Sequence, residues 1–132
     1  MLPPSLTEVI HNSPAVLLPE RYAVAKVNDV PEGVPFFIVT RDSDEITVIA
    51  TEEQLERLCC VSVEKWFRLV EFKVSVPFEA PGFLAAIAHI AADVGINVYI
   101  VSTYSKDYVL IREHEIDAAV AAFKSIGFWV KE

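Results

Sequence analysis

The stretch that decides the fold covers residues 78–111. It reads Phe78-Glu-Ala-Pro-Gly-Phe-Leu84, then an apolar-periodic segment, then Ile96-Asn-Val-Tyr-Ile-Val-Ser-Thr-Tyr-Ser-Lys-Asp-Tyr-Val-Leu-Ile111. Pro81 has a φ suited to a first helical position and no N–H to lose, and Gly82 lets the backbone bend without placing a side chain over the helix start. We therefore predict a strand, a glycine-bearing turn, a helix with an uncapped start, and a hairpin.

Two periodicities predict the helix and the hairpin. Apolar residues first recur at three- and four-residue steps, which place them in one stripe on a helix that Gly95 can end. They are Leu84, Ile87, Ala88, Ala91 and Val94. Residues 96–101 then alternate between the two faces of a strand. The polar residues 102–107 are expected to turn the chain, and residues 108–112 to run back as the second strand.

Composition excludes several classes of function. The chain has 132 residues, is 53% hydrophobic and carries a net charge of -8, so we expect an ordered, acidic protein of one compact domain or two small modules sharing a sheet. Nucleic acid is not an expected partner, because phosphate binding needs clustered Lys and Arg. No run of about twenty apolar residues and no signal peptide is present, so we expect no membrane association and a cytoplasmic location.

The two cysteines, Cys59 and Cys60, are adjacent. Neighbours in sequence rarely reach disulfide geometry, and no other Cys lies nearby to complete a metal-ligand set. We therefore predict two buried thiols in a reducing compartment rather than a redox or metal site.

Strands and turns dominate the first half. Residues 1–20 contain four prolines and are predicted to be an extended lead-in with room for one helical turn near residues 6–11. Residues 22–27 alternate as a strand, and residues 28–35 have room for a single turn but not for a full helix. Residues 36–40 and 45–50 form a hairpin, joined by Asp and Ser residues that bond their own backbone in tight turns.

Helix signals occur twice more. Thr51 is a good N-cap, with Gln54 completing a capping box, for a helix that ends near Leu58. A strand over residues 66–76 is long enough to close a first unit and enter a second. Glu115 then begins a helix that ends at Gly127, followed by a closing strand at residues 128–130. The predicted apolar face of that helix is Ile116, Ala119, Val120, Phe123 and Ile126.

The halves form an internal repeat. The second half has the order β-α-β-β-α-β and the first half β-link-β-β-α-β. This predicts an α+β fold of tandem ferredoxin-like (βαββαβ) modules, with an antiparallel sheet, helices on one face, and a first module lacking most of its first helix. The predicted divisions are a lead-in at 1–20, a truncated module at 21–70 and a complete module at 71–132.

Several motifs resemble the ACT domain, a small βαββαβ regulatory module. They are Glu79-Ala-Pro-Gly-Phe-Leu84, Ile87-Ala88, Gly95-Ile-Asn97 and the hairpin. More narrowly, Leu17-Leu-Pro-Glu-Arg-Tyr22, Trp66 and Ser102-Thr-Tyr-Ser-Lys-Asp-Tyr-Val-Leu-Ile-Arg-Glu113 resemble tandem-ACT proteins related to the cytosolic arginine sensors of animal growth signalling. The resemblance covers residues 17–130.

The resemblance implies allosteric binding of a small molecule, usually an amino acid, at a seam between ACT modules or subunits, without catalysis. The predicted partners are this ligand, a second copy of the chain in a homodimer, and a regulated protein. The Asp usual at the head of the turn is Glu79 here, and the Thr usual before the hairpin's Asp-Tyr is Lys106. The identity of the ligand therefore stays open.

The predicted ligand site combines the helix start with the hairpin. N–H groups at Gly82, Phe83 and Leu84 suit an α-carboxylate, Glu79 or Asp107 could accept from an ammonium, and neutral hydroxyl groups lie nearby. The predicted residues are Glu79, Pro81, Gly82, Phe83, Leu84, Ser102, Thr103 and Asp107. In the alternative interpretation, Pro81-Gly82 is only a tight connection, and Ser102 and Asp107 only stabilise their hairpin.

No catalytic residue, metal site or cofactor is predicted. The three histidines share no short motif, His89 is expected to form an exposed i,i+4 contact with Asp93, and no phosphate loop or nucleophile motif occurs. The alternative to ligand binding is a structural protein that dimerises and binds no small molecule.

Overall fold

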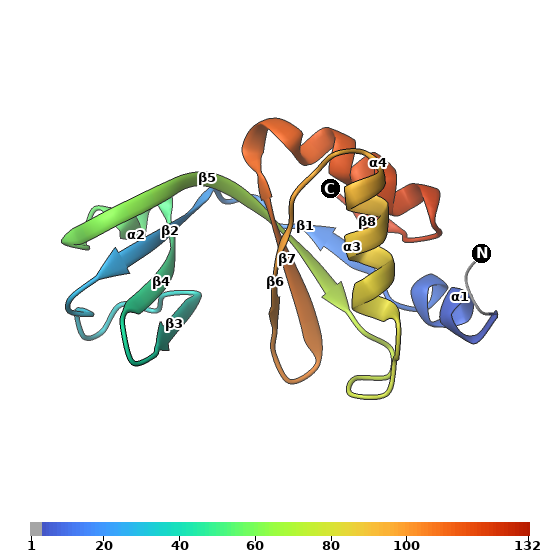
Figure 1. Cartoon of the computed structure of the whole chain (residues 1–132), viewed down its shortest axis with the longest axis horizontal. Helices are drawn as coiled ribbons and strands as arrows, with labels where there is room; N and C mark the ends of the chain where they lie inside the picture. The colour runs from blue at the N-terminus through green and yellow to red at the C-terminus, as the bar shows by residue number, and fades with distance from the viewer. Residues whose placement is uncertain (1–3) are drawn as a thin grey trace. The chain divides into compact units, whose positions relative to one another are not determined.

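The computed structural model describes residues 4–132. Within them, four α-helices, one short 3-10 helix and eight strands are formed (Figure 1). Their bounds are α1 Pro4–His11, β1 Ala15–Leu17, β2 Tyr22–Val27, β3 Ile38–Arg41, β4 Ile46–Thr51, α2 Glu52–Leu55, β5 Cys60–Lys73, α3 Phe83–Asp93, β6 Tyr99–Ser102, β7 Lys106–Arg112, η1 Glu113–Glu115, α4 Ile116–Ser125 and β8 Val130–Lys131. The chain divides into a larger unit, the described residues up to Pro19 with Arg68–Glu132, and a smaller unit, Glu20–Phe67.

The larger unit confirms the predicted α+β fold. Its elements follow the order β5-α3-β6-β7-α4-β8, and its strands lie in the order β6-β7-β5-β1-β8. One feature of the prediction is wrong, because β1 and β8 are parallel whereas the sheet was expected to be antiparallel. The last strand of a βαββαβ unit runs opposite to the first. Since β1 pairs antiparallel with β5, it shares the direction of β8.

Residues 4–20 form more structure than the extended lead-in that the prolines predicted, and the helical turn expected near residues 6–11 is part of α1. Helix α1 places Leu6 and Ile10 in the core of the larger unit, and β1 enters its sheet. The prolines do not prevent these elements because each lies where a helix or strand accepts a proline. Pro4 begins α1, and Pro14 and Pro19 lie just outside β1. The division into two ACT modules, residues 21–70 and 71–132, stays a prediction.

The core of the larger unit lies between one face of its sheet and α1, α3 and α4. Phe72 of β5 is at its centre and is fully buried. Its ring makes edge-to-face contacts with Phe83, Phe123 and Phe128 at centroid distances of 6.2, 5.4 and 4.7 Å. The predicted apolar face of α4 is confirmed at Ile116, Ala119, Val120 and Phe123.

The buried stripe of α3 is rotated from the prediction. Ile87 and Ala91 are buried as expected, but Phe83 and Ala86 replace the other predicted residues. Ala88 is exposed, and Leu84 and Val94 are 36% and 50% exposed. Both sets of residues have helical spacing, so periodicity alone could not separate them. As a result of the rotation, Leu84 lies on the side of α3 that faces the turn between β6 and β7.

Strand β5 belongs to both units. Its first part pairs with β2 through residues 60–67, and its last part pairs with β1 through residues 70–72. The prediction that one strand closes the first unit and enters the second is confirmed, but the strand starts at Cys60 rather than at Trp66.

The smaller unit matches its predicted element order. Strand β2 has the predicted bounds, no helix intervenes before β3, and β3 and β4 form the hairpin. Asp42 Oδ1 accepts bonds from the N–H groups of Asp44 and Glu45 at 2.8 and 2.9 Å, which hold the pKa of Asp42 below its usual value. The Thr51–Gln54 capping box is present in both directions. Helix α2 ends at Leu55, earlier than predicted.

The cysteine prediction is only partly correct. Both thiols are free, but Cys59 is exposed and Cys60 is half-buried. Partial burial raises the pKa of the Cys60 thiol, with a smaller contribution from Cys59.

Replacing Phe72 tests the central position of this ring. Phe72→Ala is expected to lower the free energy of unfolding by about 3–5 kcal/mol, because it leaves a cavity between three other rings. Trp129→Ala is the control, since Trp129 is 67% exposed and should change stability by no more than about 0.5 kcal/mol. Urea denaturation measures both, and a loss below about 1 kcal/mol for Phe72→Ala would contradict the assignment.

An alkaline titration tests the environment of Tyr22. Burial, then the charge of Glu20 and the hydrogen bond to it, raise the pKa of Tyr22 from 10.0 to about 12. The neutral phenol is therefore favoured in the fold, and its contribution to stability is present below pH 10 and lost as the pH rises through about 12. The phenolate absorbance of the wild type should contain a component with this late midpoint that Tyr22→Phe lacks. Identical titration curves, apart from amplitude, would show that Tyr22 is solvated.

Candidate functional site

An open pocket of about 520 Å³ lies in the larger unit, between the β5–α3 loop and the β6–β7 hairpin. Figure 1 shows this loop and the hairpin turn at the same end of the unit. The volume is within the range of small-molecule sites. The lining residues are Val74, Pro77, Phe78, Ala80, Pro81, Phe83, Leu84, Ser102, Thr103, Tyr104, Ser105, Lys106 and Asp107.

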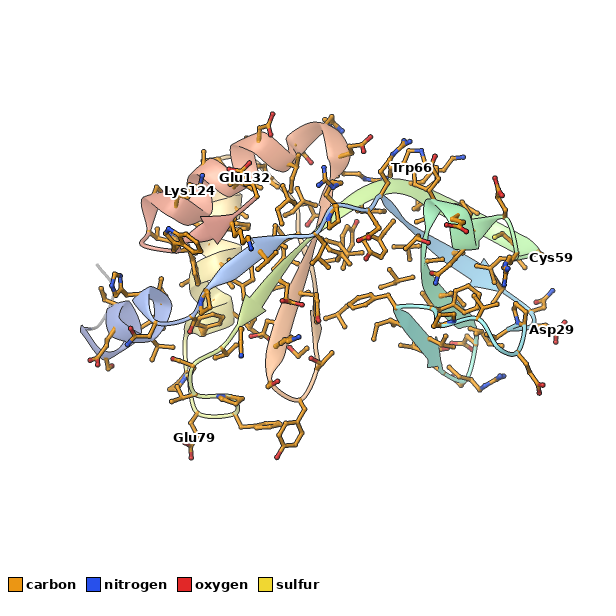
Figure 2. All side chains as sticks on the ribbon, turned by 180° about the vertical axis from the view of Figure 1, so that it is seen from behind. Asp29, Cys59, Trp66, Glu79, Lys124 and Glu132 are labelled. Atoms are coloured by element: carbon orange, nitrogen blue, oxygen red, sulfur yellow. The ribbon has the colours of Figure 1, made fainter. Side chains whose placement is uncertain are left out.

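Six of the eight predicted site residues line this pocket. They are Pro81, Phe83, Leu84, Ser102, Thr103 and Asp107. Gly82 is not among the lining residues, and the exposed Glu79 projects from the loop into solvent (Figure 2). The loop and the hairpin, 20 residues apart in sequence, thus meet as predicted, but Glu79 does not face the pocket.

The start of α3 has no side-chain cap. Gly82 occupies the N-cap position with a φ of +87°, a conformation that glycine adopts without strain. The helix begins at Phe83, two residues after Pro81, which the sequence had predicted to be the first helical position. The Phe83 N–H donates to the Ala80 carbonyl at 3.1 Å. It is therefore not one of the unsatisfied groups expected there.

Ser102 and Asp107 face each other across the hairpin. Ser102 Oγ donates to Asp107 Oδ1 at 2.6 Å, and the Thr103 N–H donates to the Lys106 carbonyl at 2.8 Å. These bonds are the ones that the hairpin-stabilising interpretation predicts. An ionised carboxylate has about four acceptor positions, so Asp107 keeps capacity for a ligand donor.

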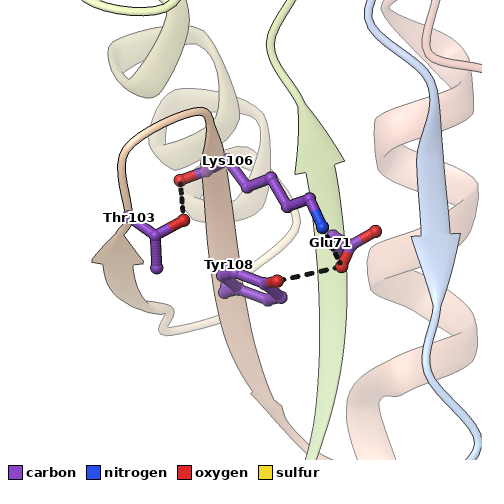
Figure 3. A network of polar contacts seen from close by, with 4 residues as sticks. All are labelled: Glu71, Thr103, Lys106 and Tyr108. Carbon is purple, nitrogen blue, oxygen red and sulfur yellow. Dashed lines mark hydrogen bonds and ion pairs between the residues drawn. The ribbon is translucent and has the colours of Figure 1, made fainter. Parts of the chain in front are cut away.

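Lys106 pairs with a carboxylate of the neighbouring strand. Its Nζ lies 3.5 Å from Glu71 Oε1, and the Tyr108 hydroxyl donates to the same oxygen at 2.9 Å (Figure 3). The positive charge of Lys106 is thus compensated by β5. Asp107 is left as the pocket's acidic side chain without a basic partner among the described residues.

Two aromatic residues at the pocket were not predicted to belong to it. Phe78 on the loop and Tyr104 on the hairpin turn have ring centroids 5.1 Å apart at an interplanar angle of 77°. Both line the pocket, although 80% of Phe78 and 82% of Tyr104 are exposed. Periodicity carries no signal for such a pair, because both residues lie outside helices and strands.

Part of the chain matches the sequence pattern of a known family. Residues 62–125 match the family model of the ACT domain. The matched segment extends from within β5 into α4 and includes the pocket. No curated protein matches the chain.

Solved structures share the fold over most of the chain. A protein of unknown function from Vibrio cholerae, described as a possible transport protein, is 20% identical with a TM-score of 0.79, covering 93% of this chain and 96% of that chain. A protein from Agobacterium tumefaciens is 18% identical with a TM-score of 0.76, covering 89% and 91%. The regulatory subunit of aspartate kinase from Thermus flavus is 12% identical with a TM-score of 0.66, covering 86% and 96%. The chain thus matches tandem ACT regulatory domains in fold.

Neither a metal-ligand cluster nor a helix long and apolar enough to cross a membrane is formed by residues 4–132. Between residues 4 and 132, no group of three or more His, Cys, Asp or Glu side chains is placed to hold a metal ion. His89 Nε2 lies 3.5 Å from Asp93 Oδ2, which confirms the exposed i,i+4 contact on α3. None of the described helices has the length and apolar character that a membrane crossing requires.

Alanine substitutions at the two ends of α3 test why glycine stands at Gly82. A Cβ there would lie 3.3 Å from Leu6 Cδ2, whereas at Gly95, with a φ of +76°, it would meet nothing within 4 Å. Gly95→Ala should lower stability by about 1–2 kcal/mol from backbone strain alone. Gly82→Ala should lower it by up to about 1 kcal/mol more, because Leu6 must shift. Urea denaturation measures both, and a smaller loss for Gly82→Ala would contradict the close packing of α1 on the helix start.

Proposed function

We propose that this ACT-domain chain is a non-catalytic regulatory protein that binds an amino acid in the pocket between the start of α3 and the β6–β7 hairpin. The observation that carries the proposal is the placement of Asp107, an acidic side chain without a basic partner among residues 4–132, in the same pocket as an uncapped helix start. A carboxylate can accept from an α-ammonium group, and the positive end of a helix favours an α-carboxylate.

The electrostatics fit a zwitterion. The first-turn N–H groups beyond Phe83 supply partial positive charge on the loop side, and Asp107 supplies negative charge on the hairpin side. Val74, Phe83 and Leu84 add apolar surface for a side chain. Glu79 has no place in this arrangement because it projects into solvent, so Asp107 replaces it as the proposed ammonium acceptor.

Regulation rather than catalysis is supported by the fold. The ACT-domain match and the fold shared with a regulatory subunit of aspartate kinase both favour a module that changes the activity of a partner. In this proposal the open side of the pocket faces a subunit seam, and the chain is a cytoplasmic homodimer. The narrower resemblance to arginine sensors makes arginine one of the amino acids to test.

A second candidate is a structural dimerisation protein without a ligand. It is favoured by the smaller unit, in which no helix lies between β2 and β3 and therefore no helix start equivalent to that of α3 is available. Light scattering over a range of protein concentrations, with and without each amino acid, separates the two candidates. Dimerisation that no small molecule changes supports the structural role.

A thermal-shift screen against the twenty amino acids tests ligand binding. A compound present at about one hundred times its Kd should stabilise the fold by about 2.7 kcal/mol. Asp107→Asn keeps an acceptor for Ser102 but removes the charge, and it should weaken binding by at least about tenfold. Asp93→Asn is the matched control, because Asp93 is an exposed carboxylate on α3 outside the pocket. An unchanged midpoint with every amino acid, or full binding by Asp107→Asn, would refute the proposed site.

A further inference from the structure

Phe78 and Tyr104 combine exposure with a specific contact. Large aromatic side chains are usually buried, and an exposed pair needs an explanation. Each of these rings is about four-fifths exposed, yet they meet edge to face with centroids 5.1 Å apart. This geometry is the one that aromatic pairs prefer. The contact joins two segments that are separate in sequence.

The backbone at Phe78 is strained. Its φ is +68°, and among residues 4–132 it is the only non-glycine residue with a positive φ. Bulky residues rarely adopt this conformation, and such strain is often found at functional sites. Burial of the ring does not compensate for it, because the ring is exposed. The strained backbone instead places the ring where it meets Tyr104.

The pair lies at the pocket. Phe78 comes from the loop side and Tyr104 from the hairpin side, and both line the cavity. Their contact therefore spans the two walls that carry the helix start and Asp107. A molecule bound between these walls would lie beside the two rings.

We propose that Phe78 and Tyr104 form an aromatic clasp that controls access to the pocket. An exposed edge-to-face contact favours the arrangement in which the two rings touch over the one in which they are apart by roughly two- to tenfold in population. The rings therefore separate readily without a ligand. The role of the clasp in holding an amino acid rests on the proposed function. The clasp itself does not, because it is a property of the two rings.

Thiol labelling measures clasp opening without any ligand. Val74 lines the pocket and is 9% exposed, so Val74→Cys places a reporter on an inner wall, in a background carrying Cys59→Ser and Cys60→Ala. Reaction with Ellman's reagent follows the open fraction when opening is fast. Phe78→Ala and Tyr104→Ala should each raise the labelling rate by roughly two- to tenfold. The double variant should show no further increase, because both substitutions break one contact. Trp129→Ala, an exposed aromatic outside the pocket, should leave the rate unchanged.

Two further measurements keep the test decisive. Ser105→Cys, also at the pocket, replaces the reporter if Val74→Cys does not fold. Phe78→Gly removes the ring and the strain together, so it should speed labelling without lowering the Tm. The clasp would be overturned by unchanged labelling rates in both alanine variants, or by multiplicative effects in the double variant. It would also be overturned if slow labelling disappeared when the protein is diluted, because a second copy of the chain would then be what covers the pocket.

The clasp and the proposed function can fail separately. Amino-acid stabilisation with unchanged labelling rates would reject only the clasp. Faster labelling in both alanine variants, with no amino acid shifting the Tm, would support the clasp and reject the ligand class.

Discussion

Backbone pairing along β5 is the constraint on which both units depend. Over its 14 residues this strand pairs with β2 in the smaller unit and with β1 and β7 in the larger one. Its inward side chains supply Phe72 to the core, and its other face supplies Glu71 to Lys106 and Tyr108. A single continuous strand thus fixes the sheet, the aromatic core and one anchor of the hairpin.

The pocket is a consequence of how β5 ends. The chain leaves the sheet after Lys73 and needs a sharp turn before α3, which Gly82 provides at a positive φ. The same loop places Phe78 beside the hairpin turn. Because Glu71 compensates the charge of Lys106, Asp107 is left facing the pocket without a basic partner among the described residues. The connection that builds the fold therefore also builds the proposed site.

Local sequence signals predicted much of this arrangement. The β2 strand, the Asp42 turn, the Thr51 capping box and the α4 stripe depend on neighbours in sequence, and all were confirmed. The hairpin and the helix start could be placed for the same reason. The errors are the entry of β1 into the sheet, the early start of β5, the buried face of α3 and the direction of Glu79, which local patterns do not determine.

The sequence by itself determined the element order of the βαββαβ unit and the positions of its turns, because hydrophobic periodicity and turn chemistry are short-range. Only the tertiary structure decided which face of α3 is buried, that the N-terminal segment enters the sheet between β5 and β8, and that Phe78 meets Tyr104. These depend on packing between segments far apart in the chain. Long-range packing selects one among several arrangements that satisfy the same local pattern.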